Sequence, residues 1–343
     1  MVLRPALLIP VLACLAAPAG ADRVRGVTIS THTDGRDWAG DGIVSTMAEI
    51  RTLGAGWVAI HPYASIGNDG SVRHWDLGGE RPDWLDRPIR EAHAHGLKIF
   101  IKPHLAYWGS RFAWRGDITF ESPQAWERFW RSYREWIVEL AAVTRDADAF
   151  AVGTELDRTL GCETEWRDLV ADVRAVTGAP LTYAANWADY TRVPFWDTVD
   201  IVGIQAYFPL TETMVPDSLE LVRGWTSRMR ELAVFADSLD CHIVFTELGY
   251  NRSFDAPRQP WAYRVDGPEA EPMQSLCLRI ALESIEREPA VVGAFLWKWF
   301  PDPHPVGRNF QLATPELRRA ISGVWIPAAV FSDHGPPTRG GKR

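Results

Sequence analysis

Two glutamates occupy matching places in separate apolar segments of the sequence. Glu155 ends the run Phe-Ala-Val-Gly-Thr-Glu, and Glu247 ends the run His-Ile-Val-Phe-Thr-Glu. Such runs are typical of buried strands, so both carboxyl groups are expected where a strand leaves the core. Burying a carboxylate costs free energy unless it is paired or solvated, which favours a shared site over two unrelated positions. One protonated and one ionised carboxyl group are what the hydrolysis of a glycosidic bond requires.

Other polar side chains also stand at the ends of apolar segments or in the loops that follow them. They include Lys102, His104, Arg115 and Asn186. Donors and acceptors that converge at strand ends are typical of a site for a polar ligand, so we expect these four to bind sugar hydroxyl groups. Tyr207 ends a further segment, and we expect its hydroxyl to donate to Glu247 and favour the ionised carboxylate.

A metal-dependent hydrolase is the main alternative on the same elements. The one His-x-His pattern, at residues 93–95, falls in a predicted helix, and no His-Glu-x-x-His motif occurs. His61 and His104 could ligate a metal, but the neighbouring Lys102 would oppose a cation. The sequence therefore favours a site without a metal or another cofactor.

From residue 25 onward, short apolar runs alternate with helical patterns. The runs cover residues 25–30, 57–63, 97–105, 150–156, 181–187, 201–210, 242–250 and 291–300. The clearest helix begins at Ser122-Pro123, with apolar residues every three or four positions as far as Leu140, which predicts a face packed on a sheet. Further helices are predicted at about 41–53, 83–95, 164–177, 216–238, 271–288 and 314–322. The connection around Phe195 has room for about one helical turn.

Eight strand-helix units predict an α/β fold, a single (β/α)8 TIM barrel. The runner-up is a doubly wound open sheet, which the sequence after the first run disfavours. It reads Ser-Thr-His-Thr-Asp-Gly over residues 30–35 and lacks the Gly-x-Gly-x-x-Gly turn. In a barrel, the carboxyl ends of the strands meet at one face, which would bring Glu155 and Glu247 together.

Composition limits the classes of partner. The 343 residues carry a formal net charge of −8, which gives no basic surface for nucleic acid. Tryptophan is unusually common, with 17 residues against 14 phenylalanines and 8 tyrosines. Either stacking on sugar rings or a core rich in large side chains would explain this excess.

The first 21 residues have the pattern of a secretory signal peptide. Arg4 precedes an apolar stretch over residues 6–17, and Ala-Gly-Ala at 19–21 is a small-x-small cleavage pattern. Cys14 lies in a loose lipoprotein-type processing site, and its lipidation would provide the one expected contact with a membrane. We expect a catalytic domain over residues 22–326, a disordered C-terminal tail over 327–343, and a protein that is secreted, periplasmic or anchored to a surface through lipid.

Six short motifs, taken together in this order, resemble glycoside hydrolase family 113, a family of clan A retaining β-glycosidases. They are Lys102-Pro103-His104, Trp114-Arg115-Gly116, Gly153-Thr154-Glu155-Leu156, residues 181–187, residues 206–210, and Thr246-Glu247-Leu248-Gly249-Tyr250. The resemblance runs from about residue 24 to residue 325.

This resemblance implies endo-β-1,4-mannanase activity by a retaining mechanism, with Glu155 as acid/base and Glu247 as nucleophile. It also implies that Trp297 is the aromatic residue that floors the site. Gln205 departs from the acidic residue expected two positions before Tyr207, which leaves the substrate contacts there in doubt.

We therefore expect a monomer that hydrolyses a β-linked oligo- or polysaccharide. Two alternatives remain open from the sequence: a retaining hydrolase of another β-glycan, such as a glucan or galactan, and a sugar-binding protein without catalysis on the same fold.

Overall fold

The computed structural model describes residues 23–263, 268–301 and 310–326. The expected signal peptide with Cys14 and the expected tail at 327–343 lie outside these residues. No helix in the described ranges is long and apolar enough to cross a membrane.

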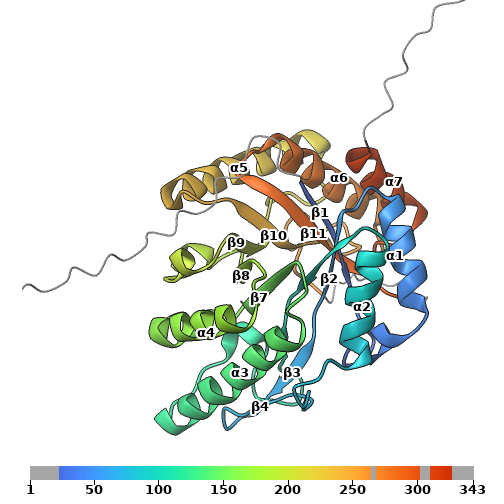
Figure 1. Cartoon of the computed structure of the whole chain (residues 1–343). Helices are drawn as coiled ribbons and strands as arrows, with labels where there is room; N and C mark the ends of the chain where they lie inside the picture. Colours follow the sequence, from blue (N-terminus) through green and yellow to red (C-terminus); the bar gives the residue numbers. More distant parts are fainter. Residues whose placement is uncertain (1–22, 264–267, 302–309, 327–343) are drawn as a thin grey trace, which may run out of the picture.

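Parallel strands form a closed barrel at the centre of the molecule, in the order β1-β11-β10-β9-β8-β7-β5-β2 (Figure 1). Strand β1 pairs with both β2 and β11, and this pairing closes the ring. The (β/α)8 prediction is thereby confirmed. The barrel strands are β1 (Val24–Ile29), β2 (Trp57–Ile60), β5 (Lys98–Ile101), β7 (Ala149–Thr154), β8 (Leu181–Asn186), β9 (Val202–Gln205), β10 (Ile243–Leu248) and β11 (Val291–Trp299).

Helices surround the barrel on its outer face (Figure 1). They are α1 (Gly42–Thr52), α2 (Asp83–Ala94), α3 (Pro123–Val143), α4 (Glu163–Val176), α5 (Ser218–Leu239), α6 (Glu271–Arg287) and α7 (Pro315–Trp325). Helix α3 begins as predicted, because the Ser122 side chain accepts a hydrogen bond from the Ala125 amide at 3.1 Å and Pro123 takes the first helical position.

One barrel connection has no α-helix. Between β8 and β9 the chain forms two single-turn 3-10 helices, Tyr190–Arg192 and Trp196–Thr198. Phe195 lies between them and is fully buried. The short connection expected around this residue is confirmed.

Two predicted strands are each divided by a proline. The runs 57–63 and 97–105 continue past the barrel, but β2 ends before Pro62 and β5 ends before Pro103. A proline lacks the N–H that a barrel ladder requires. After it, the chain forms a small separate sheet in the order β4-β3-β6. Its strands are β3 (Tyr63–Ile66), β4 (Val72–Arg73) and β6 (His104–Ala106).

Part of the tryptophan excess lies in the core, where seven of the 17 tryptophans are buried. On α3, Phe129, Tyr133 and Trp136 are buried against the barrel, as the helical spacing predicts. Trp299 is also buried in the core. A second cluster fills the barrel interior, with one residue from each of five strands: Ala59, Phe100, Ala151, Val244 and Phe295.

Candidate active site

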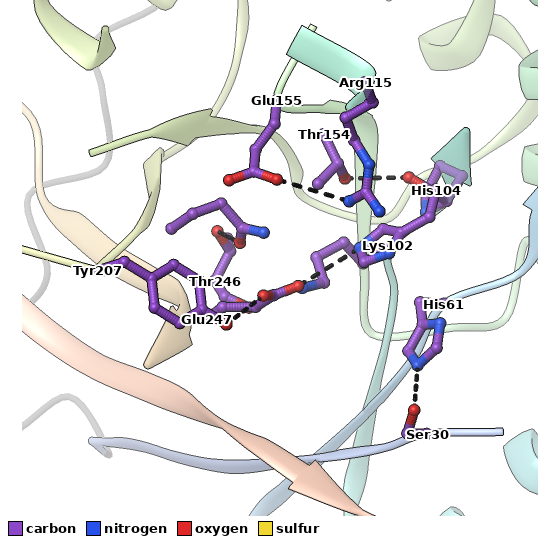
Figure 2. A network of polar contacts seen from close by, with 12 residues as sticks. Ser30, His61, Lys102, His104, Arg115, Thr154, Glu155, Tyr207, Thr246 and Glu247 are labelled. Carbon is purple, nitrogen blue, oxygen red and sulfur yellow. Dashed lines mark hydrogen bonds and ion pairs between the residues drawn. The ribbon is translucent and has the colours of Figure 1, made fainter. Parts of the chain in front are cut away.

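The two glutamates stand at the carboxyl ends of the fourth and seventh barrel strands. Glu155 directly follows β7, and Glu247 lies near the end of β10. Figure 2 shows the carboxyl group of Glu155 near Arg115 and that of Glu247 near Lys102 and Tyr207. Glu155 has a φ of 51°, in the left-handed region that residues other than glycine rarely adopt. The chain therefore turns away from the direction of β7 at this residue.

Packing behind β7 fixes the position of Glu155. Gly153 lies so close to helices α3 and α4 that a Cβ atom there would come within 2.7 Å of the Trp166 ring and 2.9 Å of the Tyr133 hydroxyl. On the far side of Glu155, the Leu156 amide donates to the Tyr183 hydroxyl at 2.8 Å. The Glu155 amide itself donates to the Ala184 carbonyl at 2.9 Å. Glu155 is therefore held by contacts on both sides along the chain.

Three side chains surround the carboxylate of Glu247. The Lys102 ammonium forms an ion pair with Oε1, and the Tyr207 hydroxyl donates to Oε2 at 2.7 Å. His104 Nε2 lies 3.4 Å from Oε1. Burial alone would raise the pKa of Glu247, but the Lys102 charge and the contact with His104 outweigh burial and hold this pKa well below its usual range. Glu247 is thus ionised at neutral pH.

Glu155 has a different environment. Asn186 Nδ2 donates to its Oε1 at 3.2 Å, and Arg115 lies 3.6 Å from its Oε2. Burial raises the pKa of Glu155, and the nearby charge of Glu247 adds to the rise, while Arg115 opposes it. The pKa values of the two carboxyl groups are therefore shifted in opposite directions, which suits one group to donate a proton and the other to attack.

A cleft of about 580 Å³ contains both glutamates. Five of the other residues predicted for the site also line it, namely His104, Arg115, Asn186, Tyr207 and Trp297. The expected hydrogen bond from Tyr207 to Glu247 is confirmed. The assignment of these five residues to sugar binding stays a prediction.

Lys102 occupies a different place from the one expected. Its side chain is fully buried behind Glu247 and does not line the cleft. It donates to the Thr246 carbonyl at 3.1 Å as well as to the Glu247 carboxylate. A buried ammonium that is bound in this way has no surface for sugar hydroxyl groups, so the predicted sugar contact of Lys102 does not fit the structure.

A layer of aromatic rings lies beside the carboxylate of Glu247. His61 stacks on His104 with ring centroids 5.0 Å apart, and Trp297 lies 5.1 Å from His61. His61 Nε2 is 3.2 Å from the Ser30 hydroxyl (Figure 2). Burial lowers the pKa of both histidines well below the usual value, so both are neutral rings at neutral pH. Among the described residues, no group of three or more His, Cys, Asp or Glu side chains is placed to hold a metal ion.

The sequence interpretation missed several residues of the cleft. Trp261 and Tyr263 line it from the loop after β10, and Trp261 stacks on Trp187 at 5.3 Å. Asp157 and Asp189 line it near Glu155. Two aromatic residues close together in a proline-containing loop after a barrel strand were the available signal for the first pair.

Comparisons with known proteins find a matching family and similar folds. The model of Glycoside Hydrolase Family 113 matches residues 27–307. The structure of the β-mannanase AaManA from Alicyclobacillus acidocaldarius, in complex with ManMIm, superposes with a TM-score of 0.77 at 23% identity, covering 89% of this chain and 97% of that one. A GH113 β-1,4-mannanase in a complex structure gives a TM-score of 0.78 at 17% identity, covering 90% of this chain and 100% of that one.

A more distant neighbour is a Glycoside Hydrolase Family 5 mannosidase from Rhizomucor miehei. It has a TM-score of 0.61 at 12% identity, with coverage of 89% and 92% of the two chains. At these identities the solved structures show a shared fold. No curated protein matches the sequence.

Proposed function

This chain belongs to glycoside hydrolase family 113 and is a glycoside hydrolase, and we propose that it cleaves β-1,4-mannosidic bonds with retention of anomeric configuration. The substrate assignment draws on the names of its structural neighbours, which are β-mannanases. The mechanism draws on the cleft that holds Glu155 and Glu247.

The observation that carries the mechanism is the unequal treatment of the two carboxyl groups. Glu247 is held ionised by Lys102 and Tyr207, as a nucleophile must be. The pKa of Glu155 is raised by burial, as a general acid requires. In the first step Glu247 attacks the anomeric carbon while Glu155 gives its proton to the leaving oxygen. In the second step Glu155 takes a proton from water, and that water releases the sugar from Glu247.

The remaining residues of the cleft have roles in binding. Trp297 and the stacked pair Trp187 and Trp261 offer flat apolar faces for sugar rings. Asn186 and Arg115 lie on the Glu155 side, where the leaving group must be. We assign both to contacts with the substrate as well as to Glu155.

Hydrolysis by the full chain should be measured on linear mannan, a mixed-linkage glucan and a galactan. Proton NMR of the first product formed then reports its anomeric configuration. We expect mannan to be cleaved best and the β-anomer to appear first. Preferred cleavage of the glucan or galactan would move the substrate to another β-glycan. Initial formation of the α-anomer would refute retention, and binding without product would refute catalysis.

We also propose that the protein is exported, on the basis of the N-terminal pattern over residues 1–21. Expression in a bacterium, followed by fractionation and mass measurement of the mature chain, tests this. A mass that begins at residue 22 supports export by simple cleavage, and a lipid adduct on Cys14 supports anchoring. An unprocessed cytoplasmic chain refutes both.

A further inference from the structure

Lys102 is a buried cation, and the carboxylate that balances its charge belongs to Glu247, the proposed nucleophile. Its side chain has no exposed surface. Among the described residues, Glu247 is the one carboxylate within ion-pair distance of the ammonium. Its second acceptor is the uncharged Thr246 carbonyl at 3.1 Å, and the Trp297 ring centroid lies 5.2 Å away. The charge of Lys102 therefore depends on Glu247 for compensation.

The double-displacement reaction removes this compensation for part of each cycle. When a Glu247 oxygen bonds to the anomeric carbon, the bond from that carbon to the leaving oxygen breaks and Glu155 supplies the proton. Glu247 is then a neutral ester. The Lys102 ammonium stays buried, with a carbonyl and an aromatic ring as its remaining partners. A buried charge that loses its partner is strongly unfavourable.

We propose that the buried charge of Lys102 destabilises the glycosyl-enzyme ester relative to free Glu247 and thereby speeds its hydrolysis. Water attacks the anomeric carbon and gives a proton to Glu155, the bond between that carbon and the Glu247 oxygen breaks, and Glu247 recovers its negative charge. The ion pair with Lys102 reforms at the same moment. This inference rests on the proposed retaining mechanism and makes Lys102 a positioning residue that acts through Glu247.

The protonation of Lys102 is consistent with this dependence. Burial lowers the pKa of Lys102 to about 8, although Glu247 opposes the fall. The ammonium form is thus maintained partly by the carboxylate beside it. In the ester that support is gone, so Lys102 is either an unpaired ammonium or has been forced to release its proton. Both cost free energy relative to the ion pair, and hydrolysis of the ester recovers it.

The chain offers a matched control in Lys298. Its pKa is also lowered to about 8 by burial, and its ammonium lies 5.0 Å from the centroid of the same Trp297 ring. In the described part of the chain it forms no ion pair with Glu247. Replacing Lys298 removes a lysine charge near the site without removing the partner of the nucleophile.

The test measures accumulation of the glycosyl-enzyme with a dinitrophenyl β-mannoside, whose leaving group needs no protonation. Parent, Lys102→Met, Lys102→Gln and Lys298→Met are compared by rapid-mixing absorbance and by intact mass after acid quench. We expect both Lys102 variants to show a burst of phenolate and an added sugar mass, with kcat and KM both about tenfold lower or more. The parent and Lys298→Met should show no accumulation.

Several results would overturn the inference. The inference is wrong if neither Lys102 variant accumulates the ester, or if Lys298→Met accumulates it to the same extent. It is also wrong if Lys102→Met accumulates the ester and Lys102→Gln, which keeps a donor without the charge, does not. The burst itself separates a further case. A Glu247 that merely fails to ionise slows the formation of the ester and gives no burst, whereas slow hydrolysis of the ester gives one. Circular dichroism verifies folding, and either neutral variant that folds suffices to refute the inference. A parent that cannot turn over any β-glycoside would refute the proposed function itself.

Discussion

Tyr207→Phe removes one hydroxyl from the site and leaves the ring in place. The lost contact is the hydrogen bond to Glu247 Oε2 at 2.7 Å, made inside the cleft by a residue that is only 7% exposed. A hydrogen bond to a charged group contributes about 1.5–3 kcal/mol, which corresponds to roughly a 10- to 150-fold loss of rate if it acts fully in the transition state.

Loss of orientation should dominate over loss of ionisation in this variant. The Lys102 ion pair and the nearby His104 remain to favour the charged form of Glu247. Without the hydroxyl the pKa of Glu247 rises, but it starts well below the usual range. At neutral pH the carboxylate is therefore still ionised, and the decrease should appear in kcat with little change in KM.

Initial rates on mannan or an aryl β-mannoside across pH measure this effect. Tyr250→Phe is the matched control, since its buried hydroxyl accepts from the Trp225 indole at 3.1 Å in the core. We expect the control to lose stability and to keep its turnover. A Tyr207→Phe enzyme within twofold of the parent, or one altered only in KM, would show that the hydroxyl does not position the nucleophile.

Three further predictions concern the two carboxyl groups. Arg115→Met should move the alkaline limb of kcat/KM to higher pH, because Arg115 lowers the pKa of Glu155 and Glu155 must be protonated to act; an unchanged limb, or an equal shift in Arg111→Met, would contradict this. Glu155→Ala should lose activity on mannan by about 100-fold or more yet still form the covalent intermediate with activated aryl mannosides, and azide should restore turnover with a β-azide product detectable by NMR. Glu247→Ala should be inactive on activated and natural substrates alike, and azide there should give the inverted α-product; near-parent activity on mannan would reverse the assignment.

The barrel could be predicted because its signals are periodic and local. A few residues are enough to recognise an apolar run, a helical spacing or the helix start at Ser122-Pro123. The prediction that one face of α3 packs in the core is confirmed. The small sheet was missed, since β3 and β6 continue the same apolar runs and only Pro62 and Pro103 separate them from the barrel.

The sequence could place those side chains whose position depends only on where a strand ends. Glu155, Glu247 and Tyr207 are of this kind. Lys102 does not, because whether a residue at a strand end faces the cleft or lies behind another side chain depends on its neighbours in space. Trp261 comes from a loop without periodicity, so the sequence offered no register from which to place it in the cleft.

The left-handed backbone of Glu155 has a cost in folding stability. A φ of 51° disfavours every residue with a Cβ by roughly 1–2 kcal/mol, and glycine alone adopts it freely. The carboxyl group is also buried at a cost in solvation. Glycine at this position would relieve both penalties, but it would also leave Arg115 and Asn186 without their carboxylate partner. The melting temperature of Glu155→Gly therefore measures which is larger, the strain and desolvation that Glu155 costs or the two contacts that it makes.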